Sequence, residues 1–392
     1  MKKRTIGAVA CAAVLAIAAP AMAIDVSGYG NIKLGTFWTQ NSFYSAAGAK
    51  RTDGDFSLDN FGDSFVGVRA KDGDFSGVAE VGAYNPKAYS KGVELRLLFV
   101  DWDFGNGKLR IGKTPSPYVY RSQQVWDSDG GFNGYGSLWD GRYANIKLTM
   151  KNGFYVTAMQ PRVGNAANNT TNVSPNSDVT AAYSQTANTY ATTYTNYNTY
   201  LPKMVFGYEG TKDRWNYGGG VAYNLYKVTT STNNSSPQAQ DVHSYLVFFH
   251  GKVDLSPVEL SYNLFTGRNV GDLMSTATGN GTSNTLANPG SANGAYFDTL
   301  HGVNSYTYGG WGQVGYRFTD KAVLYTGASY VVDDNKISHA DERMAAFMNV
   351  NLNIANRFLL VPEVDFVNDM QNTLGQKEPR SIIAGAKWQM SF

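Results

Sequence analysis

The residues of this chain that could do chemistry are its four histidines and its charged side chains. None of the histidines lies in a spaced metal motif such as H-E-x-x-H, and no G-x-S-x-G nucleophile turn occurs. The histidines are His243, His250, His301 and His339. We therefore expect no catalytic residue, no metal site and no cofactor, and we predict that the protein is not an enzyme.

A glycine-rich stretch, GYGNIKLG at residues 28–35, loosely resembles a phosphate-binding loop. Its residues alternate as in a β-strand, and glycines in a strand commonly mark curvature or a close backbone approach. We interpret these glycines as part of a curved strand, which leaves no phosphate site in the sequence.

The charged side chains occupy every second position of short apolar runs. At residues 93–99, Glu94 and Arg96 alternate with Val93, Leu95, Leu97 and Phe99. A period of two indicates a β-strand with one apolar and one polar face. The alternation predicts one polar wall, made of Lys33, Arg69, Glu80, Glu94, Arg96, Arg110, Asn145 and Lys147.

The last twelve residues, SIIAGAKWQMSF, alternate in the same way up to the terminal Phe392. Trp388 and Met390 share the face of Phe392. Because soluble domains commonly end in polar, poorly ordered residues, an apolar face at the very end predicts contact with another apolar phase. We expect these three side chains to face lipid.

The first 23 residues have the pattern of a secretory signal peptide. A basic start is followed by an apolar run and by Ala21-Met22-Ala23, a small-residue cleavage site. Cleavage there leaves residues 24–392, removes the only cysteine and lowers the formal charge from +2 to about −1. This balance argues against nucleic acid as a partner.

Composition and periodicity together predict a transmembrane β-barrel as a single domain at residues 24–392. The chain has 42 Gly, 26 Tyr, 20 Phe and only 16% charged residues, and after the signal no apolar run is long enough for a membrane-spanning helix. We count about sixteen antiparallel strands, with seven short turns after even-numbered strands and eight longer connections after odd-numbered ones. The longer connections include residues 38–58, 161–199 and 268–303. A barrel of this size is too wide for side chains to fill, which predicts a water-filled lumen.

Three stretches resemble the Gram-negative general porins, a family of trimeric, sixteen-stranded barrels. They are DSFVGVRAKDGDFSGVAEVG, VELRLLFVDWDFGNGKLRIGKTPSP and GRYANIKLTMKNGFYVTAMQ. The terminal Phe392 resembles the assembly signal of the family. The resemblance implies an outer-membrane location, short turns on the periplasmic side and a homotrimer.

The resemblance also implies that residues 114–137 fold into the barrel and narrow the pore. This loop carries Arg121, Asp127 and Asp129. Its carboxylates would face a basic wall made of Lys33, Arg69, Arg96, Arg110 and Lys147. Opposed charges across a water-filled slot would orient polar solutes and penalise apolar ones.

The sequence therefore predicts an outer-membrane porin for passive diffusion of small hydrophilic solutes and ions. A channel selective for sugars or small carboxylates is an alternative, and a sugar track would use Trp126, Trp139 or Trp311. A structural or adhesive barrel acting through its surface loops, such as residues 161–199 and 271–300, is a second alternative. The expected partners are outer-membrane lipid, lipopolysaccharide and small solutes.

Overall fold

The computed structural model describes most of the chain beyond residue 23. The described residues are 24–44, 50–61, 63–83, 93–161, 179–186, 189–232, 238–274, 295, 297, 302–334, 336, 339–371, 375 and 377–392. The predicted signal peptide at residues 1–23 and His301 lie outside this part of the chain.

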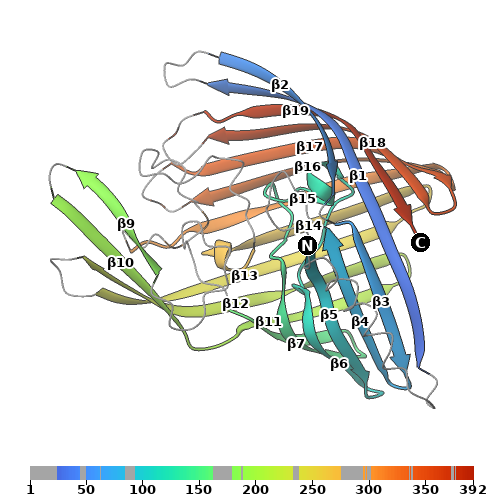
Figure 1. The fold of residues 1–392 in the computed structure, drawn as a ribbon, viewed down its shortest axis with the longest axis horizontal. Helices are drawn as coiled ribbons and strands as arrows, with labels where there is room; N and C mark the ends of the chain where they lie inside the picture. Colours follow the sequence, from blue (N-terminus) through green and yellow to red (C-terminus); the bar gives the residue numbers. More distant parts are fainter. Residues whose placement is uncertain are drawn as a thin grey trace, which may run out of the picture.

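Nineteen strand segments form one antiparallel sheet that closes on itself. The sheet closes where β1 pairs with β19 and Leu34 lies opposite Trp388, and Figure 1 shows these two strands side by side. The segments are β1 (Asp25–Tyr44), β2 (Lys50–Asn60), β3 (Phe65–Asp72), β4 (Phe75–Ala83), β5 (Val93–Asp103), β6 (Gly107–Pro115), β7 (Arg142–Met150), β8 (Phe154–Met159), β9 (Val179–Thr186), β10 (Thr189–Thr199), β11 (Lys203–Lys212), β12 (Trp215–Thr232), β13 (Gln238–Asp254), β14 (Val258–Arg268), β15 (Tyr306–Thr319), β16 (Ala322–Asp334), β17 (Asp341–Ala355), β18 (Phe358–Gln371) and β19 (Arg380–Ser391).

Three pairs of segments each make one barrel strand, so the nineteen segments form sixteen strands. Segments β2 and β3 pair with successive parts of β1, and β10 and β11 pair with successive parts of β12. Segments β8 and β9 pair in turn with β11 and β10. The predicted fold class, a closed antiparallel barrel of about sixteen strands, is confirmed.

The connections differ in length between the two ends of the barrel. Seven connections of two or three residues, at 73–74, 104–106, 151–153, 213–214, 255–257, 320–321 and 356–357, lie at one end, which we call the short-turn end. The other connections lie at the other end, the loop end, and all of them except the two-residue step from β9 to β10 are longer. The described helices are the single-turn α2 (Trp126–Asp129) and the 3-10 helix η1 (Val270–Asp272), and no described helix is long and apolar enough to cross a membrane.

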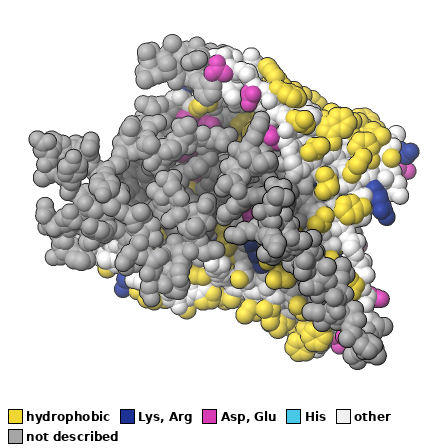
Figure 2. All heavy atoms as spheres, viewed as in Figure 1, with side chains coloured by type: hydrophobic (Ala, Val, Ile, Leu, Met, Phe, Trp, Pro, Cys, Tyr) yellow, Lys and Arg dark blue, Asp and Glu magenta, His cyan; other side chains and the backbone are white. Residues whose placement is uncertain are grey.

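The outer face of the barrel is apolar. Trp388, Met390 and Phe392 expose 41%, 60% and 59% of their surfaces there. Figure 2 shows hydrophobic side chains over much of the wall that is not hidden by undescribed residues. Such an apolar outer wall is the surface that a transmembrane barrel presents to lipid.

Two predicted loops contain strands. The predicted loop at residues 38–58 is largely a hairpin in which β1 continues to Tyr44 and β2 begins at Lys50, and the predicted loop at 161–199 contains β9 and β10. The predictions were wrong because they required alternation. Residues 179–199 are rich in Thr, Tyr, Asn and Ala and show no regular alternation, so period-two reasoning did not identify β9 and β10.

The sequence also predicted the wrong face of the sheet for two residues of β5. The register between β4 and β5 shifts at Arg96, so Leu97 and Phe99 do not continue the outward face of Val93 and Leu95. Beyond this bulge, Leu98, Val100 and Trp102 are the exposed residues. One extra residue in a strand moves every later side chain to the opposite face.

The seam between β1 and β19 depends on Gly385. A Cβ atom at this position would lie 2.1 Å from the Thr36 carbonyl oxygen and 2.5 Å from the Phe37 ring. The substitution Gly385→Ala is expected to cost about 1–3 kcal/mol, as overpacking does. The measurement is the temperature at which the folded, fast-migrating band disappears on a gel. Gly312→Ala in β15 is the matched control, because nothing lies within 4 Å of its added Cβ. Equal transition temperatures would contradict the prediction.

Candidate functional site

The connection between β6 and β7, residues 116–141, crosses the barrel interior. It leaves the wall at β6 and returns at β7, yet it contacts β17, which lies eight strands from β7 in the sixteen-strand barrel. Asn349 of β17 donates a 2.7 Å hydrogen bond to the Gln123 carbonyl oxygen. In Figure 1 this teal segment passes between the front and back strands.

The wall satisfies the polar backbone groups of the crossing loop. The Glu363 carboxylate of β18 accepts hydrogen bonds from the Val125 and Trp126 amides, at 2.8 and 2.5 Å. Arg343 of β17 donates to the Gly134 carbonyl oxygen at 3.0 Å. Because buried amides and carbonyls are costly when unpaired, these contacts fix the path of the loop.

The loop carboxylate Asp129 binds two lysines of the barrel seam. Lys33 of β1 lies 2.5 Å from one oxygen and Lys387 of β19 lies 2.8 Å from the other. The sequence predicted that Asp129 faces a basic wall across a slot, whereas here the loop and the wall are in direct contact. Asp127 belongs to α2, but its side chain lies outside the described ones.

Three arginines gather around Asp63, in the short break between β2 and β3. Arg96, Arg121 and Arg142 lie 2.9, 3.1 and 3.1 Å from its carboxylate oxygens. Arg96 also lies 3.5 Å from Glu80. We call these residues, with Lys33, Asp129 and Lys387, the central charge cluster. It holds five cations and three carboxylates.

Sequence reasoning missed two members of this cluster, Asp63 and Arg142. Asp63 interrupts a strand and so gives no alternation signal. Arg142 stands at the start of the GRYANIKL stretch, where the predicted polar face could have included it.

The remaining predicted wall residues have local partners. The Arg69 guanidinium lies 4.0 Å from the Tyr29 ring centroid, and Tyr29 donates a 2.7 Å hydrogen bond to Glu80. Arg110 forms a two-pronged pair with Asp101, at 2.7 and 2.8 Å.

Three further wall residues also pair within the wall. Lys147 lies 4.3 Å from the Tyr155 ring centroid. Glu94 lies 3.4 Å from Lys113 Nζ, and Asn145 donates to Thr114 at 2.7 Å. Of the predicted basic wall, the structure thus brings Lys33 and Arg96 into the central charge cluster and leaves Arg69, Arg110 and Lys147 in separate pairs.

The end of the crossing loop is held by a buried ion pair. Asp140 and Lys203 of β11 form this pair, and both side chains are 0% exposed. Tyr118 donates a 2.9 Å hydrogen bond to the same carboxylate, and Ser116 donates one at 3.4 Å. A buried charge is tolerated only when it is paired and hydrogen-bonded, so this contact ties the loop to the wall.

Aromatic rings in the interior are packed against each other. Tyr120 stacks on His250 with ring centroids 4.4 Å apart and on Trp311 at 5.5 Å. Arg121 and Arg142 lie over the Trp139 ring, at 4.1 and 5.0 Å. Because Trp311 is only 3% exposed, its ring does not offer a free face for stacking a sugar.

Two of the described histidines have ordinary hydrogen-bond partners. His250 lies 3.1 Å from Glu209, and His243 lies 2.7 Å from the Tyr223 hydroxyl. Among the described residues no three His, Cys, Asp or Glu side chains form a group that could hold a metal ion.

At the loop end, Glu378 lies in the connection before β19, in a pocket of the rim that Glu342, Lys377 and Arg380 also line. Burial and the charges of Asp341 and Asp369 raise the pKa of Glu378 to about 8, against the opposing effect of Arg343. This carboxyl is therefore mostly protonated near neutral pH.

The chain matches no protein-family model and no curated protein. Its fold, however, matches solved outer-membrane proteins. The outer membrane channel DcaP of Acinetobacter baumannii is 14% identical, with a TM-score of 0.63 over 94% of this chain and 97% of that one. The trimer form of Vibrio cholerae OmpT is 12% identical, with a TM-score of 0.56 over 95% and 100%. The anion-selective porin of Comamonas acidovorans is 11% identical, with a TM-score of 0.55 over 94% and 100%.

These comparisons define the class of fold. The protein has the closed sixteen-stranded barrel of Gram-negative outer-membrane porins. The resemblance that the sequence motifs predicted is confirmed at the level of the fold.

The buried ion pair gives a double-mutant test. Lys203→Met leaves the Asp140 charge buried without its cation and is expected to cost about 3–5 kcal/mol. Adding Asp140→Asn removes the charge and keeps an acceptor for Tyr118. The double variant is therefore expected to regain most of the stability that the single variant loses. The measurements are the unfolding temperature and protease cleavage within residues 116–141, with the exposed-turn variant Lys321→Met as control. Equal stability of the single and double variants would rule out the role of this pair.

The pKa of Glu378 predicts a pH dependence of stability. Because the folded pKa, about 8, is above the usual value of 4.5, the folded state holds the proton more tightly than the unfolded state does. This contribution is complete below about pH 4.5 and is lost as the pH rises through 8. Glu378→Gln should therefore stabilise the barrel at pH 8–9 and change little at pH 4, as measured by unfolding temperature. A pH profile identical to that of wild type, or equally altered by Asp320→Asn in a short turn, would refute this assignment.

Proposed function

We propose that the protein is an outer-membrane porin that lets small hydrophilic solutes and ions diffuse through a water-filled channel. The observation that carries this proposal is the loop at residues 116–141, which crosses a barrel of porin fold and is hydrogen-bonded to the far wall. In this proposal the loop narrows the pore, and Arg121 and Asp129 stand at the constriction with Asp127. A barrel whose purpose is only structural has no need for a charged, loop-narrowed interior.

The location follows from the same proposal. The apolar outer face lies in the outer membrane, in contact with lipid and lipopolysaccharide, and the short-turn end faces the periplasm. Residues 1–23 act as a cleaved signal peptide. The protein works as a homotrimer, as the resemblance to general porins implies, and it acts without enzymatic chemistry.

The central charge cluster favours one of the alternatives, a preference for small carboxylates. Its five cations outnumber its three carboxylates, and Lys33, Asp129 and Lys387 keep 12%, 16% and 9% of their side chains exposed to the interior. A ring of excess positive charge at a narrow point favours anions. The packed rings of Tyr120 and Trp311 give no comparable support to a sugar channel.

The first experiment is single-channel conductance in a planar lipid bilayer, with the reversal potential measured under a salt gradient. Stable conductance steps are the expected result, with a reversal potential that indicates anion preference. Insertion without conductance would overturn the channel proposal and favour an adhesive barrel that acts through its loops.

The charge cluster makes a prediction about selectivity. Asp129→Asn removes the carboxylate that forms ion pairs with Lys33 and Lys387, so the constriction gains net positive charge. The reversal potential should shift toward stronger anion selectivity, whereas Lys33→Gln with Lys387→Gln should shift it the other way. Asp320→Asn, in a short turn, is the matched control. Unchanged reversal potentials in channels that still conduct would exclude Asp129 from the constriction.

A further inference from the structure

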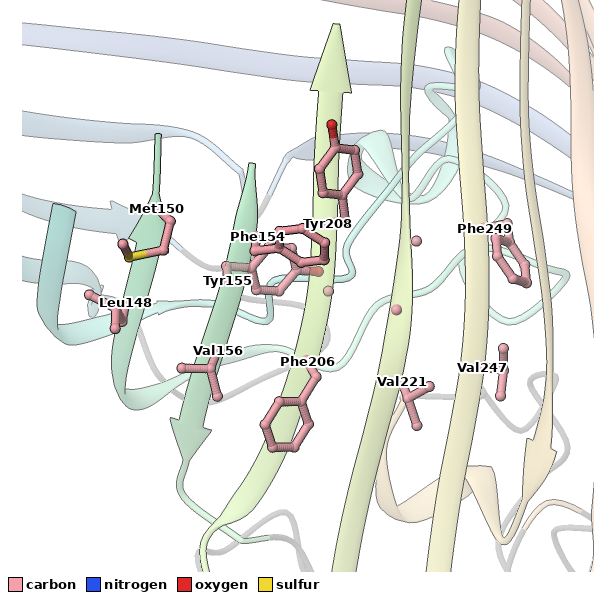
Figure 3. A pocket seen from close by; sticks show the side chains of 13 residues that line it. Leu148, Met150, Phe154, Tyr155, Val156, Phe206, Tyr208, Val221, Val247 and Phe249 are labelled. Carbon is pink, nitrogen blue, oxygen red and sulfur yellow. The ribbon is translucent and has the colours of Figure 1, made fainter. Parts of the chain in front are cut away.

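A groove of about 600 Å³ lies on the outer face of the barrel, over β7, β8, β11, β12 and β13. Its lining is uncharged and almost wholly apolar. Figure 3 shows its side chains, with Val221 between Phe206 and Phe249 and with Phe154 beside Tyr208. The other labelled residues of the outer lining are Leu148, Met150, Val156 and Val247.

The groove lies where β12 has a glycine at an outward position, with the Phe249 ring beside it. Along this strand Tyr217, Gly219 and Val221 share the outer face, and Gly219 lies between Tyr208 of β11 and Phe249 of β13. Phe206 and Phe249, 54% and 58% exposed, rise on either side of the groove. The depression is therefore built into three neighbouring strands.

The turns below this groove concentrate positive charge. The turn of β7 and β8 carries Lys151, and the turn of β11 and β12 carries Lys212 and Arg214, all exposed, with Asp213 as the single acid. These strands are adjacent, because the Glu209 amide of β11 donates a 3.0 Å hydrogen bond to the Gly153 carbonyl oxygen of the first turn.

The β17–β18 turn carries one cation, Arg357, whereas two other short turns have no positive excess. Lys71 is offset by Asp72 and Asp74 at the β3–β4 turn, and Asp320 and Lys321 balance each other at the β15–β16 turn. Trp215 and Tyr217, 52% and 40% exposed, lie between the cations and the groove. Aromatic residues at such a level mark the headgroup region of a membrane.

We propose that this groove and its turns form a binding site for an anionic phospholipid in the leaflet at the short-turn end. One acyl chain lies in the groove, and the phosphate lies against Lys151, Lys212 and Arg214. Charge complementarity favours an anionic headgroup. The cation cluster matches the phosphate of such a lipid, and the apolar groove beside it matches the acyl chain. The inference rests on the proposed insertion of the barrel in a membrane.

The test is native mass spectrometry of the full protein released from detergent with added lipid. The two probes are dioleoylphosphatidylglycerol and dioleoylphosphatidylcholine, which share their acyl chains and differ in headgroup charge. Wild type is expected to retain the phosphatidylglycerol preferentially. Replacing Lys151, Lys212 and Arg214 together by Ser should weaken this retention at least about fivefold. The control variant replaces Lys71, Lys321 and Arg357 by Ser and should leave it unchanged.

A second variant tests the groove itself. Val221→Trp fills it from within and should reduce retention of both lipids, whereas Val314→Trp, at an outward position of β15 with nearly equal exposure (43% against 44%), should not. Folding of each variant is checked by its heat-modifiable gel mobility.

Equal retention of the two lipids by wild type, or no difference between either variant and its control, would overturn the site. Loss of oligomer peaks in Val221→Trp without loss of lipid would overturn it as well, because a second copy of the chain would then occupy the groove. The conductance of the same variants is measured as well. Variants that conduct but show none of the expected lipid effects overturn the lipid site and leave the channel proposal intact.

Discussion

Closure of the sheet between β1 and β19 is the constraint on which the rest of the molecule depends. In hydrocarbon, each unpaired backbone amide or carbonyl costs several kcal/mol, so a membrane-spanning sheet cannot have an edge. The seam meets this requirement with twelve paired positions, from Asn31 opposite Ser391 to Ser42 opposite Arg380. Once the sheet is closed, every residue points either outward or inward. The period-two pattern of the sequence is a consequence of that choice.

Closure also creates the problem that the crossing loop solves. A sixteen-stranded wall encloses more space than its own side chains can fill. Residues 116–141 enter this space with their own amides and carbonyls, and Glu363, Asn349 and Arg343 of the wall pair with them. Apolar loop side chains such as Tyr118 and Phe132 pack against inward residues of the wall. The polar inner face thus holds the loop in place.

The sequence predicted what is local and periodic. Strand count, turn asymmetry and the outward position of Trp388 follow from alternation, which a strand in a membrane must show. What it could not predict depends on distant pairs. Arg121 meets Asp63 across 58 residues, and Val125 meets Glu363 across 238. The bulge in β5 was missed because apolar residues occur both before and after the one unpaired residue, so the sequence pattern does not mark the shift. In β13 apolar residues lie on both faces, because the fully buried Phe248 points inward and packs against Tyr118 of the loop, with ring centroids 5.6 Å apart.

On both faces of this sheet a neighbouring aromatic ring takes the space of a missing side chain. On the inner face, the space at Gly385 is taken by the Phe37 ring, and the space at Gly207 is taken by the Tyr155 ring. Protein neighbours are available there, because the wall curves toward itself and the loop lies within. On the outer face the Phe249 ring lies beside Gly219, 2.8 Å from where a Cβ atom would be, and the groove opens next to that ring. We propose that in a membrane an acyl chain completes the packing of that surface.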